Sequence, residues 1–313
     1  MQITGQYLMN LVLNGLLIGS IYALMALGLT LIFSVLGIVS FAHGEYYMIG
    51  GYVVYFLLEG FTDLHPLLAI LAAGVVTFLI GVVFERLFLQ PMARGEIERP
   101  SEYAILVTFG LAFFLQYLVQ GIVGPHSKRA DRFFDLPKVD LGWLTSSAGT
   151  LKVGGTPLSA SRLAAAAMAL LLLLAMIYFI RRTWVGKGLQ AVSQDKEAAA
   201  VVGINPLNMN TLAFGLGTML AGLSGATLVD VFAWVPWIGV QASSKAFVII
   251  VLGGMGSMPG AMLGGLIIGV VESLGSGLLP DPSRALAYKD AFGLLIFALV
   301  LLLKPTGLFG REL

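Results

Sequence analysis

The first 58 residues carry a single charged side chain, Glu45, and no lysine or arginine occurs before Arg86. About 20 consecutive apolar residues allow a helix to cross the ~30 Å hydrocarbon core of a bilayer. The composition of the chain agrees with this, because 58% of its residues are hydrophobic and only 11% are charged; soluble domains contain roughly 25% charged residues. The chain is therefore expected to be an all-α, polytopic membrane protein with the lipid bilayer as its solvent.

The charge-free apolar runs predict eight or nine transmembrane segments. Two regions leave the number open, because polar or glycine-rich breaks interrupt them near residues 37–40 and 253–260. The predicted segments are two within 7–58, then 66–84, 103–123, 163–180, 208–229, two shorter ones within 238–279, and 290–303. Polar stretches at 90–102, 124–161, 181–206 and 280–290 connect them, and none is long enough for a separate domain. Residues 1–313 are expected to form a single transmembrane domain.

The distribution of basic residues does not determine how the chain is oriented across the membrane. The loops 124–161 and 181–206 flank one predicted segment, so they lie on opposite sides of the membrane, yet they carry five and four basic residues respectively. The positive-inside rule needs a clear excess on one side. The composition alone therefore leaves open which of the two loops is cytoplasmic.

The composition also limits the possible chemistry. A net charge of +1 argues against a nucleic-acid partner, and the absence of cysteine removes disulfides and thiolate metal sites. The sequence has no GxxxxGK[ST] phosphate-binding loop, and its three histidines form no HExxH motif. Ser257 could be an intramembrane nucleophile, but a serine beside glycines is more often a packing residue. No enzymatic activity, cofactor or metal is expected in this chain.

Four ionisable residues fall inside apolar runs, namely His43, Glu45, Lys245 and Glu272. A charge at membrane depth costs at least ~2.5–3.5 kcal/mol, so such groups are usually paired, neutralised or in contact with water. Each is therefore a candidate functional residue. For His43 and Glu45 two interpretations stay open, a hydrogen-bonded structural pair at a helix start or a role in a translocation pathway. At the end of another predicted segment, Glu85 and Arg86 are interpreted as an interfacial ion pair.

Small residues recur at a spacing of four, which lets helices approach closely in a membrane. The spacing occurs at Gly15 and Gly19, at Gly256, Gly260 and Gly264, and at Gly265 and Gly269. The two broken regions, 40–52 and 253–265, share an outline of an apolar run, a break and a small-residue helix. Discontinuous helices often mark the translocation site of a transporter. The candidate pathway residues are His43, Gly44, Glu45, Gly254, Gly256, Ser257 and Glu272.

The polar loop RRTWVGKGLQAVSQDKEAAAVVGINPLNMN, residues 181–210, is the most informative stretch. It contains a short helix-forming run, an alanine-rich turn, Gly203, and then Asn205 and Pro206, which suit the start of a new helix. Loops that only connect two transmembrane segments are usually short and irregular. This loop is expected to form a short, rigid helix in the plane of the membrane interface.

The same loop resembles the coupling loop of bacterial ABC importer permeases, whose signature begins with Glu-Ala-Ala and has a glycine about seven residues later. Here Glu197, Ala198 and Ala199 are followed by Gly203, six residues after Glu197. The strings AVSQDKEAAAVVGINP, GLTLIFSVLGIVSFAHGEYYMIGGY, ERLFLQPMARG, SKAFVIIVLGGMGSMPGAMLGGLIIG and KPTGLFG resemble branched-chain amino acid permeases. The chain is identified as a member of that family, similar to the H-type membrane subunit of leucine/isoleucine/valine uptake systems.

The resemblance implies a multi-pass protein of the bacterial inner membrane that works with several other chains. These are a second homologous permease, two ABC ATPase subunits that bind ATP and Mg, and a periplasmic amino-acid-binding protein. It implies that the loop 181–207 is cytoplasmic and contacts an ATPase, and that the loop 124–161 is periplasmic. The implied ATPase-coupling residues are Asp195, Glu197, Ala198, Ala199 and Gly203.

Two other functions remain open from the sequence. Members of the same fold family import urea and short amides, and specificity in such systems lies mainly in the separate binding protein. Alternatively, the chain could be a secondary carrier driven by an ion gradient, with Glu45, His43 and Glu272 as a proton relay.

Overall fold

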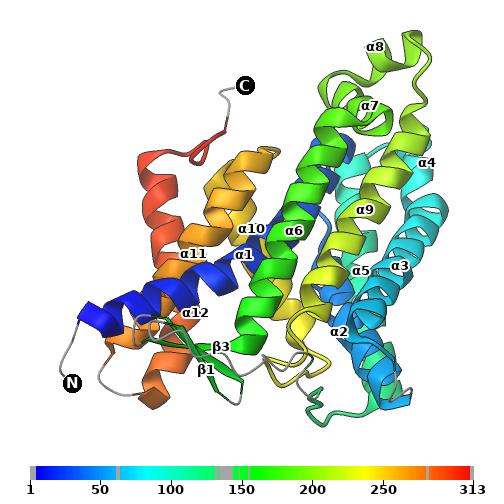
Figure 1. The fold of residues 1–313 in the computed structure, drawn as a ribbon. Helices are drawn as coiled ribbons and strands as arrows, with labels where there is room; N and C mark the ends of the chain where they lie inside the picture. The colour runs from blue at the N-terminus through cyan, green and yellow to red at the C-terminus, as the bar shows by residue number, and fades with distance from the viewer. Residues whose placement is uncertain are drawn as a thin grey trace.

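The computed structural model describes residues 5–60, 64–130, 133, 144–147, 149–153, 156–279 and 282–310. This part of the chain is almost entirely helical, which confirms the predicted fold class (Figure 1). The helices are α1 (Gly5–Leu36), α2 (His43–Gly60), α3 (Pro66–Phe84), the π-helix η1 (Glu85–Leu89), α4 (Gln90–Ala93), α5 (Pro100–Val123), α6 (Ala160–Arg182), α7 (Trp184–Gln194), α8 (Lys196–Val201), α9 (Pro206–Ala226), α10 (Ile238–Gly253), α11 (Met258–Leu278) and α12 (Pro282–Leu303).

Five stretches within the described residues are long and apolar enough to cross a membrane: α1, α3 together with η1 and α4, α5, α6 and α11. The helix α10 is apolar but shorter, with 16 residues. The number of eight or nine segments stays a prediction. The boundary before the last segment is wrong, because residues 282–290 were expected in a polar connection and instead form the first turns of α12.

Both predicted breaks are present. The first follows α1, where Gly37 has a φ of +76° and its N–H donates to the carbonyl of Phe33. The second separates α10 from α11, and Gly254 there has a φ of +100°. Glycine adopts this left-handed backbone without steric cost, so both helices end where the sequence predicts. Ser257 then caps α11 by accepting a hydrogen bond from the N–H of Gly260 at 3.2 Å.

The glycines at a spacing of four bring α1 and α11 into close contact. A Cβ atom on Gly15 would lie 2.8 Å from the carbonyl oxygen of Gly269, and one on Gly19 would lie 2.9 Å from that of Gly265. Only glycine allows the two backbones to approach this closely, which confirms the packing interpretation of the motif.

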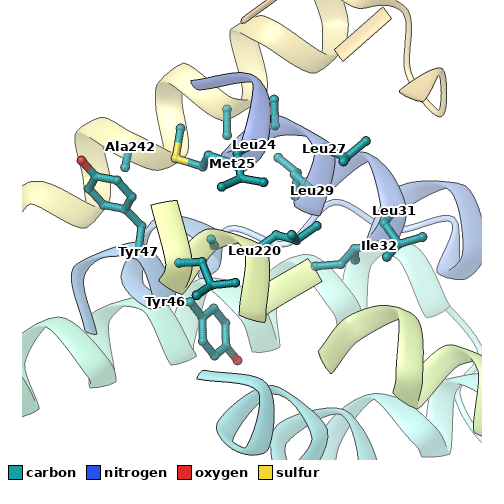
Figure 2. Packing of buried hydrophobic residues seen from close by; sticks show 14 of the residues in the cluster. Leu24, Met25, Leu27, Leu29, Leu31, Ile32, Tyr46, Tyr47, Leu220 and Ala242 are labelled. Atoms are coloured by element: carbon teal, nitrogen blue, oxygen red, sulfur yellow. The ribbon is translucent and has the colours of Figure 1, made fainter. Parts of the chain in front are cut away.

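The core lies around α1, α2, α9 and α10. Figure 2 shows buried side chains of α1, among them Leu24 and Leu29, near Tyr46 of α2 and Leu220 of α9. By contrast, α5 buries only Ala104, Thr108 and Leu115 of its 24 residues. Many of its exposed side chains are large and apolar, such as Leu106, Phe114 and Ile122, as expected for a helix that faces lipid.

A small antiparallel sheet occupies part of the long loop between α5 and α6. Its strands are β1 (Leu144–Ser147), β2 (Thr150–Val153) and β3 (Thr156–Ser159), in the order β1-β2-β3, with Ser147 paired to Thr150 and Val153 paired to Thr156. The sheet lies at one end of α6, and α7 and α8 lie at the other end (Figure 1). The two polar loops are therefore at opposite ends of the molecule. Most of the loop between Ala130 and β1 lies outside the described residues.

Candidate functional site

The predicted interfacial helix is a pair of helices, α7 and α8, that follows α6 directly. Thr183 caps α7, because its hydroxyl oxygen accepts a hydrogen bond from the N–H of Gly186 at 3.0 Å. A Cβ atom on Gly186 would overlap the carbonyl oxygen of Phe179. The glycine therefore allows α7 to fold back tightly against the end of α6.

Four of the five predicted coupling residues belong to α8 or its N-terminal cap. Asp195 caps the helix, and its carboxylate accepts hydrogen bonds from the N–H groups of Glu197 and Ala198 at 2.9 and 3.0 Å. Ala199 is buried, whereas the Glu197 side chain is exposed. Gly203, with a φ of +87°, ends the segment. The two caps make this six-residue helix a defined structure even though it is too short to be stable in isolation.

The sequence interpretation missed three exposed apolar residues of this helix pair. The exposed fractions are 88% for Trp184, 86% for Val201 and 74% for Val202. Their signal in the sequence is the presence of large apolar side chains in a polar loop. Because α7 and α8 lie at one end of the molecule (Figure 1), these exposed apolar side chains are accessible for contact with another protein.

The start of α2 is buried between α1 and α10, and its residues make separate contacts. The Nε2 atom of His43 lies 3.0 Å from the carbonyl oxygen of Met25, and Nδ1 has no hydrogen-bond partner among the described residues. The Glu45 carboxyl group packs against Gly239, where a Cβ atom would approach it to 2.5 Å. The interpretation of His43 and Glu45 as a hydrogen-bonded pair is therefore wrong.

Gly44 accounts for the close contact between α2 and α10. Its N–H donates to the Ser243 hydroxyl group at 2.8 Å, and a Cβ atom there would overlap the Gly239 carbonyl oxygen. The Ser243 hydroxyl group in turn donates to the carbonyl of Phe41. A side chain of α10 thus forms hydrogen bonds with two backbone groups that the break leaves without a helical partner, the carbonyl of Phe41 before α2 and the N–H of Gly44 in its first turn.

The second break, between α10 and α11, does not lie beside the start of α2. Gly254, Gly256 and Ser257 are at the far end of α10, and the C-terminal segment closes this break through hydrogen bonds from the N–H groups of Leu308 and Phe309 to residues 252 and 253. Gly254 lies nine residues beyond Lys245, which corresponds to about 13 Å along a helix axis. The structure therefore does not place these three residues beside Glu272, and their role in a pathway stays a prediction.

Glu272 belongs to an ionic cluster that joins four helices. The Nζ atom of Lys245 lies 2.7 and 2.8 Å from the two carboxylate oxygens of Glu272, 2.8 Å from Oδ1 of Asp290 and 3.1 Å from the hydroxyl group of Tyr22. The Nζ atom of Lys289 lies 3.4 Å from Oε2 of Glu272. Two cations thus balance two carboxylates, which removes most of the cost of placing charge among apolar helices.

A cavity of about 470 Å³ lies beside this cluster. Part of its wall is polar and charged, and part is aliphatic and aromatic, which is the composition typical of small-molecule sites. The lining residues are Tyr22, Met25, Tyr47, Leu228, Phe232, Ala233, Val235, Trp237, Ile238, Gln241, Ala242, Lys245, Lys289 and Asp290. Within the described part of the chain, no group of three or more histidine, aspartate or glutamate residues could hold a metal ion.

Glu85 was expected to form an interfacial pair with Arg86, and this is wrong. Its side chain is fully buried, and its carboxylate accepts a hydrogen bond from the hydroxyl group of Thr211 in α9. Arg86 is exposed. The π-helical turn at this point continues α3 beyond its predicted end, and the polar partner on α9 could not be identified from the sequence.

Membrane-spanning helices, a cavity with a partly polar wall and a capped helix pair at one end of the molecule are the architecture of a multi-pass membrane transport protein. Comparison with known families identifies the kind of transport protein. Residues 11–303 match the model of the permease component of the branched-chain amino acid transport system. The chain belongs to this family.

Individual relatives align over nearly the whole chain. BraD of Pseudomonas aeruginosa, named a high-affinity branched-chain amino acid transport system permease protein, is 36% identical over 97% of this chain and 96% of its own length. LivH of Salmonella typhimurium, which carries the same description, is 33% identical over the same shares. LivM of Salmonella typhimurium, also named a high-affinity branched-chain amino acid transport system permease protein, is 26% identical over 81% of this chain and 61% of its own length.

Proposed function

We propose that this chain is the permease subunit of an ATP-driven importer that moves branched-chain amino acids from the periplasm to the cytoplasm across a bacterial inner membrane. Membership of the family supports the role of a transport permease, and the names of the relatives support branched-chain amino acids as the substrate class. The single structural observation that carries the ATP-driven part is the capped helix pair α7–α8 with its exposed apolar side chains.

In this proposal α7 and α8 contact a separate ATPase subunit on the cytoplasmic side. Trp184, Val201 and Val202 would be covered by the ATPase, and the cap at Asp195 would keep α8 rigid enough to transmit its movement. The chain supplies no phosphate-binding loop of its own, so two partner subunits would bind ATP and Mg.

The likeness to LivM supports pairing with a second, homologous permease. A periplasmic binding protein would deliver the amino acid to the end of the molecule that carries the small β-sheet. This end is the side of the loop 124–161, opposite α7 and α8.

The two alternatives receive less support. A proton relay through His43, Glu45 and Glu272 would need a continuous chain of groups, but His43 contacts Met25 whereas Glu272 contacts Lys245 and Lys289. Urea and short amides carry no charge, whereas two lysines and one aspartate line the cavity. These charges favour a zwitterionic substrate.

The test is leucine uptake by cells whose ATP is depleted while the membrane potential is maintained. The proposal predicts that uptake stops, and that ATP-binding subunits copurify with the tagged chain. Uptake that persists without ATP and collapses with the proton gradient would overturn the proposal in favour of a secondary carrier.

A further inference from the structure

The cavity lies where the helical framework is interrupted. At 16 residues, α10 is about 24 Å long, less than the ~30 Å of a bilayer core. The non-helical connection 227–237 precedes it and supplies five of the cavity-lining residues, namely Leu228, Phe232, Ala233, Val235 and Trp237. Irregular backbone at membrane depth is tolerated where it is buried in protein or lines a cavity. Here its polar groups are satisfied in part by the paired hydrogen bonds between Lys128 and Trp234.

The ionic cluster lies near the middle of its helices. Tyr22, Lys245, Glu272 and Asp290 each fall within about one turn of the midpoint of α1, α10, α11 and α12, respectively. Substrate sites of membrane transporters lie near the bilayer midplane, at the point where helices are broken. The depth of the cluster therefore matches that of a substrate site and not that of the membrane interface.

The two carboxylates that hold Lys245 differ in their surroundings. The Glu272 side chain is 2% exposed and also meets Lys289, whereas the Asp290 side chain is 59% exposed and lines the cavity. Glu272 is thus a fixed counter-ion that balances the buried lysine. Asp290 can turn away into the cavity without leaving Lys245 unpaired.

We propose that the cavity binds the α-carboxylate of an amino acid at Lys245, in the position that the Asp290 carboxylate occupies in this structure. Lys289, which also lines the cavity, supplies the second positive charge. This inference rests on the proposed function and extends it, because it places a recognition site for the amino acid in the permease itself.

The remaining wall fits an aliphatic side chain. Met25, Leu228, Phe232, Trp237 and Ile238 form the apolar part of the lining, and the volume of about 470 Å³ lies within the range of small-ligand sites, roughly 300–1,000 Å³. An amino acid anchored through its carboxylate at Lys245 would direct its side chain toward these residues. The site therefore suits a branched aliphatic α-amino acid.

The experiment measures binding of radiolabelled leucine to the purified permease–ATPase complex without the binding protein, with two competitors. The first, 4-methylpentanoate, keeps the carboxylate and the branched chain but lacks the amino group; the second, leucinamide, lacks the carboxylate. In the wild type, 4-methylpentanoate should displace leucine and leucinamide should not.

The variant Asp290→Asn removes the competing carboxylate from Lys245. It should tighten the binding of 4-methylpentanoate by about tenfold, because the ligand no longer displaces an internal anion. Glu102→Gln is the matched control, since it removes an exposed carboxylate from a surface pair with Arg99 and should leave binding unchanged. The melting temperature of each complex shows whether the variants fold and assemble.

Weaker or unchanged binding of 4-methylpentanoate to a folded Asp290→Asn complex would overturn the inference. So would equal competition by leucinamide, or the absence of leucine binding in a complex that transports. ATP-dependent uptake, measured on the same preparation, separates these failures from failure of the proposed function. If uptake is driven by ATP but no leucine binds the permease, only this inference is wrong.

Discussion

The Nζ atom of Lys196, the first residue of α8, lies 3.4 Å from the carbonyl oxygen of Leu36, the last residue of α1. Leu36 directly precedes the break at Gly37, and α1 is the helix whose side chains dominate the core in Figure 2. A side chain of the proposed coupling segment thus contacts the C-terminal carbonyl end of a central helix, where a positive charge is favourable. A displacement of α8 would act on α1 at a point where the chain can bend.

Replacing Lys196 with methionine should uncouple the two helices without affecting membrane insertion. We expect the amount of leucine transported per ATP hydrolysed to fall several-fold, while the quantity of protein in the membrane stays the same. The matched control is Lys196→Arg, which keeps a charged donor and should retain most of the coupling. Equal coupling in the methionine variant and the wild type would show that the contact has no role.

The same contact predicts a dependence on pH. Partial burial lowers the pKa of the Lys196 ammonium group below its ordinary value, because burial disfavours the charged form. As the pH rises, this lysine should therefore lose its proton before fully exposed lysines do, and the contact with the Leu36 carbonyl should weaken. The decline in coupled transport at alkaline pH should be steeper in the wild type than in Lys196→Arg. Identical pH profiles for the two proteins would contradict this.

Gly203 should tolerate asparagine better than alanine. Its φ of +87° is left-handed, and no heavy atom lies within 4 Å of the position that a Cβ atom would take, so the cost of a side chain is conformational rather than steric. That cost is about 1–2 kcal/mol for most residues and lower for asparagine. ATP-dependent uptake should fall in Gly203→Ala and be largely restored in Gly203→Asn, at equal membrane levels. A loss of uptake in the alanine variant that asparagine does not relieve would refute the conformational explanation.

The contact between α1 and α11 should be intolerant of large side chains. A Cβ atom on Gly265 would lie 2.5 Å from the backbone nitrogen of Ala23, so Gly265→Leu must separate the two helices. We expect destabilisation of at least ~1–3 kcal/mol, measured as a lower melting temperature in detergent. Gly110→Leu is the matched control, because no heavy atom lies within 4 Å of its Cβ position. Equal melting temperatures for the two variants would count against tight packing at this crossing.

The sequence predicted those parts of the structure that depend on local physical chemistry. The run of residues without charge predicted membrane helices, glycines such as Gly37 marked the breaks, and the spacing of Gly15 and Gly19 identified a close helix contact. The caps of α8 are local as well, Asp195 before the helix and Gly203 after it, but the sequence was interpreted there as an alanine-rich turn and not as a second helix. Each of these signals acts within a few residues along the chain.

The remaining features depend on contacts between distant residues. Glu85 is at the end of an apolar run, and nothing near it in the sequence shows that Thr211 donates a hydrogen bond to its carboxylate. Similarly, Lys245 and Glu272 were both recognised as ionisable residues at membrane depth, but their contact with Asp290 depends on how α12 packs. Asp290 was assigned to the edge of a polar connection, because a short polar run does not distinguish a loop from the first turns of a helix.

The central claim is that the exposed end of α8 lies in the cytoplasm and contacts an ATPase, and site-specific labelling tests it most directly. The chain has no cysteine, so Val201→Cys and Ser127→Cys each carry one exposed thiol, at the α8 end and in the loop 124–161. In intact cells whose outer membrane is permeabilised, a membrane-impermeant maleimide should label position 127 and spare position 201. In inverted vesicles, a photoactivatable crosslinker on position 201 should capture an ATP-binding subunit. Labelling of position 201 from the periplasm, or capture of no ATP-binding subunit by a transport-competent variant, would contradict the account.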